Sequence, residues 1–151
     1  MSERTVRLTR IIDAPRERVF AAWTQAEHLA RWFGPRGFTI ASCEADPRPG
    51  GVFTVCLRSA AGEEYWARGT YEEVAAPARV RIRCTADDAR GVTRLEETID
   101  VTFSKQGRRT ELRLLATAKA VAASAEAAAM LEGMPTGWAQ TVARLDDHLK
   151  R

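Results

Sequence analysis

Residues 23–39 constrain the fold more than any other part of the chain, because they place several large rings around one Gly-Pro turn. The large aromatic residues of this segment are Trp23, Trp32, Phe33 and Phe38. Leu29, Trp32 and Phe33 follow the i, i+3, i+4 spacing of a short amphipathic helix. Gly34-Pro35 stops that helix. The segment therefore predicts a short helix that ends in a tight turn.

The chain before this segment predicts a strand and another short helix. Residues 6–12 alternate apolar and polar side chains for most of their length, as a strand with one buried face does. Pro15 suits a first helical position, and Val19 and Trp23 follow it four residues apart. We expect this first helix to end near Thr24.

From Phe38 onward the period of the pattern changes to two, which predicts a run of strands. The predicted strands are residues 38–43, 52–57, 64–74, 79–84, 93–104 and 110–118. The segments that join them contain Gly or Pro and are short. The sequence therefore predicts an antiparallel meander.

The last segment predicts a long helix, with Ser124 as its cap and many alanines in its first turns. Its apolar stripe consists of Met130 or Leu131, Met134, Trp138, Val142, Leu145 and Leu149. Pro135 lies inside this pattern, and a proline inside a helix costs ~3 kcal/mol. We therefore expect a kink or a break between Met134 and Gly137.

This order of elements predicts an α+β fold. A curved antiparallel sheet wraps around the long C-terminal helix and buries its apolar stripe, and the two short helices after the first strand close one end. The 151 residues match the size of one ordinary domain, so we expect residues 1–151 to form a single domain.

Several short motifs resemble those of one known family. They are Trp23, Gly34-Pro35, Asp46-Pro47-Arg48-Pro49-Gly50-Gly51, Gly69-Thr70-Tyr71-Glu72-Glu73-Val74, Val101-Thr102-Phe103 and Gly137-Trp138. Their order resembles the START-like, birch-pollen-allergen-like (SRPBCC) superfamily, in the branch related to the C-terminal domain of the heat-shock-protein ATPase activator. Ala26 replaces the usual proline of that branch, and Phe33 replaces its second tryptophan. The resemblance implies a helix-grip fold with a cavity between sheet and helix.

Composition and charge exclude several classes of protein. No apolar run approaches the ~18 residues that span a bilayer, and the first residues lack the apolar stretch of a signal peptide, so we expect cytoplasmic residence. The net charge is only +3 and the basic residues are scattered, which argues against nucleic-acid binding. Cys43, Cys56 and Cys84 are far apart, so we expect reduced thiols and neither a disulfide nor a zinc site.

The sequence offers no recognisable catalytic set, metal site or cofactor motif. His28 and His148 lie on predicted helices, where we expect surface or capping roles. Glu97 shares the apolar face of its strand with Ile99, but it lies near a strand end, so we expect it to be solvated. For Arg68 we expect a paired or exposed side chain, although an inward guanidinium would bind a ligand carboxylate.

A mostly apolar cavity is the better candidate site, because ligand pockets are apolar with a few polar groups. The candidate lining residues are Trp32, Phe53, Val55, Trp66, Tyr71, Ile82, Met130, Met134 and Trp138. For any single one of them, packed core is the favoured interpretation. The strand over 64–74 admits two registers, with either Trp66 or Tyr71 inward. The list of candidate lining residues assumes a bulge at Gly69, which would place Trp66 and Tyr71 on the same face.

Three functions remain open, and we favour a cytoplasmic binding protein for a small hydrophobic or amphipathic molecule. This function accounts for both the fold and the missing catalytic set. The resemblance implies two alternatives. One is a chaperone-ATPase-activator-like interaction domain, with a chaperone partner and a role in the stress response. The other is an enzyme similar to polyketide cyclases and dehydratases, in which Tyr71, Arg68 or Glu97 moves protons. The sequence leaves open whether the protein is a monomer or a homodimer.

Overall fold

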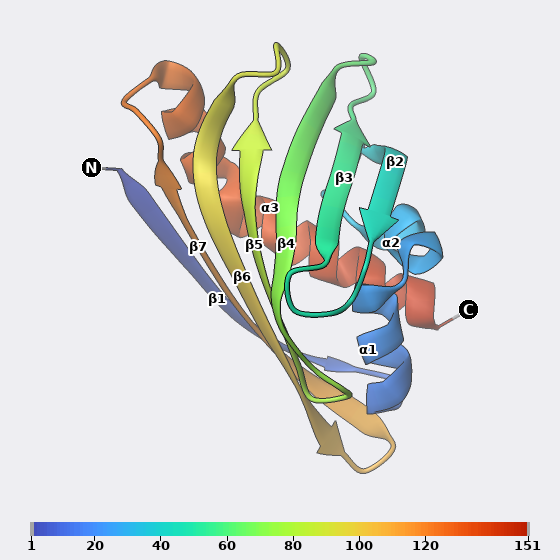
Figure 1. Cartoon of the computed structure of the whole chain (residues 1–151). Coiled ribbons are helices and arrows are strands. Elements are labelled where there is room, and N and C mark those ends of the chain that lie inside the picture. Colours follow the sequence, from blue (N-terminus) through green and yellow to red (C-terminus); the bar gives the residue numbers. More distant parts are fainter. Residues whose placement is uncertain (1, 151) are drawn as a thin grey trace.

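The computed structural model describes residues 2–150 and shows a seven-stranded sheet curved around one long helix (Figure 1). The strands are β1 (Glu3–Ile12), β2 (Thr39–Ala45), β3 (Val52–Arg58), β4 (Glu64–Ala75), β5 (Arg79–Asp87), β6 (Thr93–Gln106) and β7 (Arg109–Ala120). The helices are α1 (Arg16–Thr24), α2 (Ala26–Trp32) and α3 (Ala125–Leu149). The predicted α+β, helix-grip architecture is confirmed.

The sheet has the strand order β1-β7-β6-β5-β4-β3-β2, and every neighbouring pair is antiparallel. From β2 to β7 each strand pairs with the next one along the chain, as the predicted meander requires. β1 adds to the other edge, where Glu3 lies opposite Lys119 and Ile12 opposite Thr110. The first and last strands of the sequence therefore lie side by side.

Side-chain alternation makes one face of the sheet the inner face. In β7, Leu112 and Leu114 are buried, whereas Arg113 and Leu115, which alternate with them, are exposed. The buried stripe of α3 covers this inner face and includes Leu131, Met134, Trp138, Val142, Leu145 and Leu149. The core thus lies between the sheet and α3, as the spacing of apolar residues predicts.

α3 is a continuous helix, so the predicted break near Met134–Gly137 does not occur. Pro135 lacks the N–H that a helix would direct to the Leu131 carbonyl, and this loss weakens the helix locally. The turns on both sides are nevertheless held by buried side chains of the same stripe, which outweigh the cost of one proline. At the start of α3, the Ser124 side chain accepts a hydrogen bond of 3.0 Å from the Ala127 N–H, which confirms the predicted cap.

α1 and α2 close the end of the sheet near the C-terminus of α3 (Figure 1). The Trp23 and Trp32 rings are fully buried, with centroids 4.8 Å apart in an edge-on contact. Trp32 Nε1 donates to the Ala22 carbonyl at 3.0 Å, and the Tyr71 hydroxyl of β4 donates to the Trp23 carbonyl at 2.9 Å. These contacts join the two short helices to the sheet.

No helix within residues 2–150 is long and apolar enough to cross a membrane.

The predicted bulge at Gly69 is absent. Gly69 lies in regular register between β3 and β5, and the irregularity of β4 lies between Tyr71 and Glu73. A side chain would not fit at Gly69, because a Cβ there would overlap the Arg83 carbonyl oxygen. Alternation along β4 therefore places Tyr65, Ala67 and Tyr71 on the inner face, and Trp66 and Arg68 on the outer face.

Candidate ligand pocket

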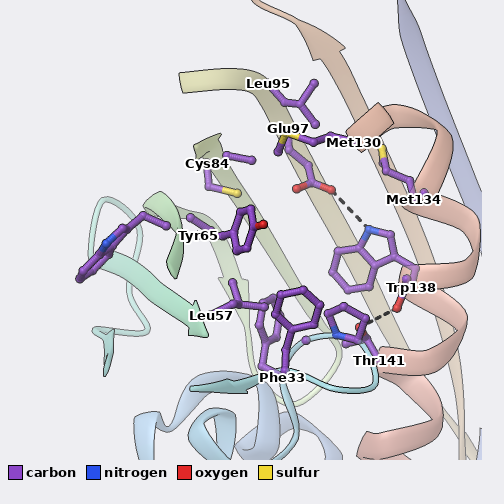
Figure 2. A pocket seen from close by; sticks show the side chains of 18 of the residues that line it. Phe33, Leu57, Tyr65, Cys84, Leu95, Glu97, Met130, Met134, Trp138 and Thr141 are labelled. Carbon is purple, nitrogen blue, oxygen red and sulfur yellow. Dashed lines mark hydrogen bonds between the residues drawn. The ribbon is translucent and has the colours of Figure 1, made fainter. Parts of the chain in front are cut away.

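A pocket of about 440 Å³ opens between the inner face of the sheet and α3 (Figure 2). The sheet contributes Phe53, Leu57, Tyr65, Trp66, Ala67, Cys84, Ala86, Asp87, Leu95, Glu97 and Ile99. α3 contributes Ala129, Met130, Gly133, Met134, Gly137, Trp138 and Thr141, and the segment after α2 contributes Phe33, Gly34, Pro35 and Phe38. Most of these side chains are apolar, which is typical of a site for a small molecule.

Two neighbouring rows of α3 give the pocket its shape. One row has small residues four apart, namely Ala129, Gly133 and Gly137. A Cβ added at either glycine would meet no heavy atom within 4 Å. A glycine inside a helix destabilises it by about 0.5–1 kcal/mol relative to alanine. The two glycines that leave space for the pocket therefore lower the stability of α3. The other row carries the large side chains Met130, Met134 and Trp138.

Two side chains of α3 hold the segment between α2 and β2: Gln140 Oε1 accepts a hydrogen bond of 3.1 Å from the Arg36 N–H, and Arg144 makes the larger set of contacts. Arg144 Nη1 donates to the carbonyls of Gly34, Pro35 and Phe38 at 3.0, 3.0 and 3.1 Å. Gly34 has φ +103°, and a Cβ there would lie 2.6 Å from Leu57 Cδ2. This segment therefore forms one wall of the pocket with a shape that Arg144 and Gly34 define.

Trp138 connects the pocket to the aromatic core. Its ring stacks on Trp23, with centroids 6.4 Å apart and an angle of 19° between the planes. Phe33 meets it edge-on at 6.0 Å. Since Trp23 also packs against Trp32, the pocket wall continues into a rigid aromatic cluster.

Glu97 is the polar group in the middle of the pocket. It projects from β6 toward α3, and its Oε2 accepts a hydrogen bond of 3.3 Å from Trp138 Nε1 (Figure 2). Burial raises the pKa of the Glu97 carboxyl from 4.5 to about 7, and the Trp138 hydrogen bond opposes this rise. Glu97 is therefore not the freely solvated strand-end residue that the sequence predicts: it is half-buried, because α3 covers this end of β6.

The other polar groups of the pocket are already engaged or neutral. Asp87 accepts a hydrogen bond of 2.8 Å from Thr93 and lies 3.8 Å from an Arg68 nitrogen. The Tyr65 hydroxyl donates to Glu63 at 3.2 Å. Burial, and secondarily Glu97 on the neighbouring strand, raises the pKa of the Cys84 thiol well above its usual value. Of the described residues that line the pocket, none is Lys, Arg or His.

A model of the protein family described as Activator of Hsp90 ATPase homolog 1-like protein matches residues 13–150. The chain belongs to this family. The match confirms the resemblance to the heat-shock-protein ATPase activator branch of the START-like superfamily. No curated protein matches the chain significantly.

Several solved structures of bacterial proteins share the fold of this Activator of Hsp90 ATPase homolog 1-like protein. A protein from Chromobacterium violaceum is 26% identical, with a TM-score of 0.83 and 97% of each chain covered. A protein from Rhizobium leguminosarum is 21% identical, with a TM-score of 0.79 over 99% of this chain and 96% of its own. The AHSA1 protein from Silicibacter pomeroyi is 20% identical, with a TM-score of 0.77 and 97% of each chain covered. The two structures that are 20% and 21% identical show a likeness of fold alone.

The structure of this family member separates the predicted site residues into two groups. Five of them line the pocket, namely Phe53, Trp66, Met130, Met134 and Trp138. The other four, Trp32, Val55, Tyr71 and Ile82, are fully buried in the core and do not border it. Trp66 belongs to the outer face of β4, where the Arg68 guanidinium lies 4.6 Å from its ring centroid, and only borders the pocket.

The sequence contains signals for several pocket residues that are not among the predicted lining residues. The alternation of β6 with Leu95 and Ile99 places Glu97 inward, and the other register of β4 places Tyr65 inward. Of the three groups considered for proton transfer, the Tyr71 hydroxyl is engaged in the core and Arg68 faces outward. Only Glu97 of these three therefore reaches the pocket.

The two histidines meet, which their separation in the sequence did not suggest. His28 Nδ1 of α2 and His148 Nε2 of α3 are 3.0 Å apart and share a hydrogen bond. Both side chains are half-buried, so they join two helices rather than act separately at the surface. Within residues 2–150, no three His, Cys, Asp or Glu side chains are arranged to hold a metal ion.

Proposed function

We propose that this protein binds a small hydrophobic or amphipathic molecule between its sheet and α3. The observation that supports the proposal best is the pocket of about 440 Å³, which is in the range of 300–1,000 Å³ of small-molecule sites. Its lining is mostly apolar and aromatic, and Glu97 supplies a polar group near the middle.

The proposed contacts come from both sides of the pocket. Phe53 would meet the apolar body of the ligand from the sheet, Phe33 from the segment after α2, and Met130, Met134 and Trp138 from α3. Methionine side chains adapt to differently shaped partners. The three cysteines are unpaired, which fits the proposed cytoplasmic location, where thiols stay reduced. We propose that residues 1–151 act as a single domain.

Native mass spectrometry of the freshly purified protein tests this function. A discrete added mass, recovered by solvent extraction, is the expected result for the parent chain. In Gly137→Leu the new side chain projects into the open part of the pocket, and the added mass should be lost. Ala139→Leu places the same side chain on an exposed position of α3 and should keep it.

If the purified protein carries no added mass, the readout is the binding of a solvatochromic naphthalene dye. The parent and Ala139→Leu should bind the dye, and Gly137→Leu should not. Equal dye binding by all three proteins, or none by the parent, would contradict the proposal.

Membership of the Activator of Hsp90 ATPase homolog 1-like family favours a second candidate function, which is contact with a chaperone ATPase. The expected result is a faster ATPase rate of a purified Hsp90-type chaperone when the chain is added. An unchanged rate at saturating concentrations of the chain would exclude this function.

A further inference from the structure

The charged groups of the pocket all have one sign. Glu97 and Asp87 are its ionisable carboxyls, and no cationic side chain of the described residues lines it. Asp87 is already bonded to Thr93 and close to Arg68. Glu97 receives one hydrogen bond, on Oε2, and within residues 2–150 no group donates to its Oε1. The pocket therefore offers a free acceptor and has no cation to balance it.

We infer that the ligand is a hydrophobic amine, whose ammonium group pairs with Glu97 while its apolar body fills the space beside α3. This inference rests on the proposed binding function. An ammonium group would donate a charge-assisted hydrogen bond to Oε1, which is stronger than a neutral one. A ligand carboxylate would instead be desolvated beside two carboxyls of the protein, with no donor to receive it.

The aromatic lining favours the same class of ligand. Trp138 and Phe33 surround the space in front of the Glu97 carboxyl, and Tyr65 lies across from them (Figure 2). The faces of aromatic rings attract cations, and the attraction strengthens where water is excluded. Trp138 also fixes the carboxyl through its indole N–H, so Oε1 keeps a defined direction toward the pocket.

The ionisation of Glu97 is consistent with this binding mode. Burial brings the pKa of Glu97 to about 7 in the protein without a ligand, so both charge states are populated near neutral pH. A bound ammonium group would favour the ionised form, and its binding would release a proton. The titratable groups that face Glu97 are Cys84 on β5, Tyr65 on β4 and Asp87 at the end of β5, and α3 presents none to it.

Isothermal titration with three probes that share one apolar body tests the inference. The probes are naphthylmethylammonium, naphthylmethanol and naphthoate, used at about pH 7.5, close to the raised pKa of Glu97. The parent protein should bind the ammonium probe roughly tenfold or more tightly than naphthoate, with the alcohol in between. Titrations in two buffers of different ionisation enthalpy should show proton release with the ammonium probe alone.

Two variants of β6 assign the preference to one side chain. Glu97→Gln keeps the size of the side chain and should bind the ammonium probe no more tightly than the alcohol. Glu96→Gln makes the same change on the outer face, beside Lys119, and should keep the parent's preference. Retained alcohol binding by Glu97→Gln shows that the variant is folded with its pocket intact.

The outcomes separate this inference from the binding function. If the alcohol or naphthoate binds as tightly as the ammonium probe, the inference is wrong and the binding function stands. A preference for ammonium that survives Glu97→Gln also overturns it. If none of the three probes and no naphthalene dye binds, both proposals fall together.

Discussion

At the scale of single residues, Glu97 should make the stability of the protein depend on pH. Its pKa rises from 4.5 in an exposed chain to about 7 in the folded protein, because burial disfavours the charged form. The folded state therefore binds the proton more tightly than the unfolded state, and the free energy of unfolding falls as pH rises from about 4.5 to about 7. At pH 8, Glu97→Gln should be more stable than the parent by on the order of 1–3 kcal/mol.

Urea denaturation between about pH 4 and pH 8 measures this difference. The gain of Glu97→Gln should shrink toward zero near pH 4, where the carboxyl is protonated in both states. Glu96→Gln is the control, because the Glu96 side chain is half exposed and pairs with Lys119 at 3.9 Å. A gain for Glu97→Gln that does not change with pH would contradict the assigned role of burial.

At the scale of elements, Arg144 decides how the α2–β2 segment sits against α3. One guanidinium nitrogen donates to the carbonyls of Gly34, Pro35 and Phe38. Arg144→Ala would leave these carbonyls without their donor, and we expect a loss of about 2–3 kcal/mol in the free energy of unfolding. The amides of residues 34–38 should also exchange with solvent faster than in the parent, since the wall of the pocket loses its fixation.

Arg144→Lys is the matched variant, because its ammonium group still donates to carbonyl oxygens. It should recover part of the lost stability and of the amide protection. Equal exchange rates in the parent and in Arg144→Ala would show that Arg144 does not hold the segment, which the Gln140 hydrogen bond and apolar contacts would then fix.

At the scale of the whole molecule, the pocket exists at the expense of stability. Gly133 and Gly137 open space along α3, although a Cβ would fit at both positions. Changing either residue to alanine should raise the free energy of unfolding by about 0.5–1 kcal/mol, and the double variant should show both gains. The same variants should bind naphthalene probes less tightly, because each methyl group occupies part of the pocket.

Ala128→Gly is the control for the helix, since Ala128 is exposed on α3 outside the pocket. It should lower stability by a similar amount and leave probe binding unchanged. Loss of stability in Gly133→Ala or Gly137→Ala, measured by urea denaturation, would show that the space beside α3 is smaller than the structure indicates.

The sequence by itself determined the kind and order of the elements. Spacing of two marks the strands, and spacing of three and four marks the helices, because each pattern depends only on neighbouring residues. The strand starts and ends agree within a few residues, the Ser124 cap is present, and the aromatic segment at residues 23–39 carries the family resemblance. The existence of a pocket between sheet and α3 was expected only through that resemblance.

The tertiary structure decided the features that depend on residues far apart in the chain. β1 pairs with β7, Tyr65 rather than Trp66 faces inward, and Glu97 is half-buried beneath α3. His28 meets His148, and α3 continues through Pro135 because its packing outweighs one lost hydrogen bond. Local periodicity gives a face to each side chain, but the strand register and the helix above that face decide what the side chain meets.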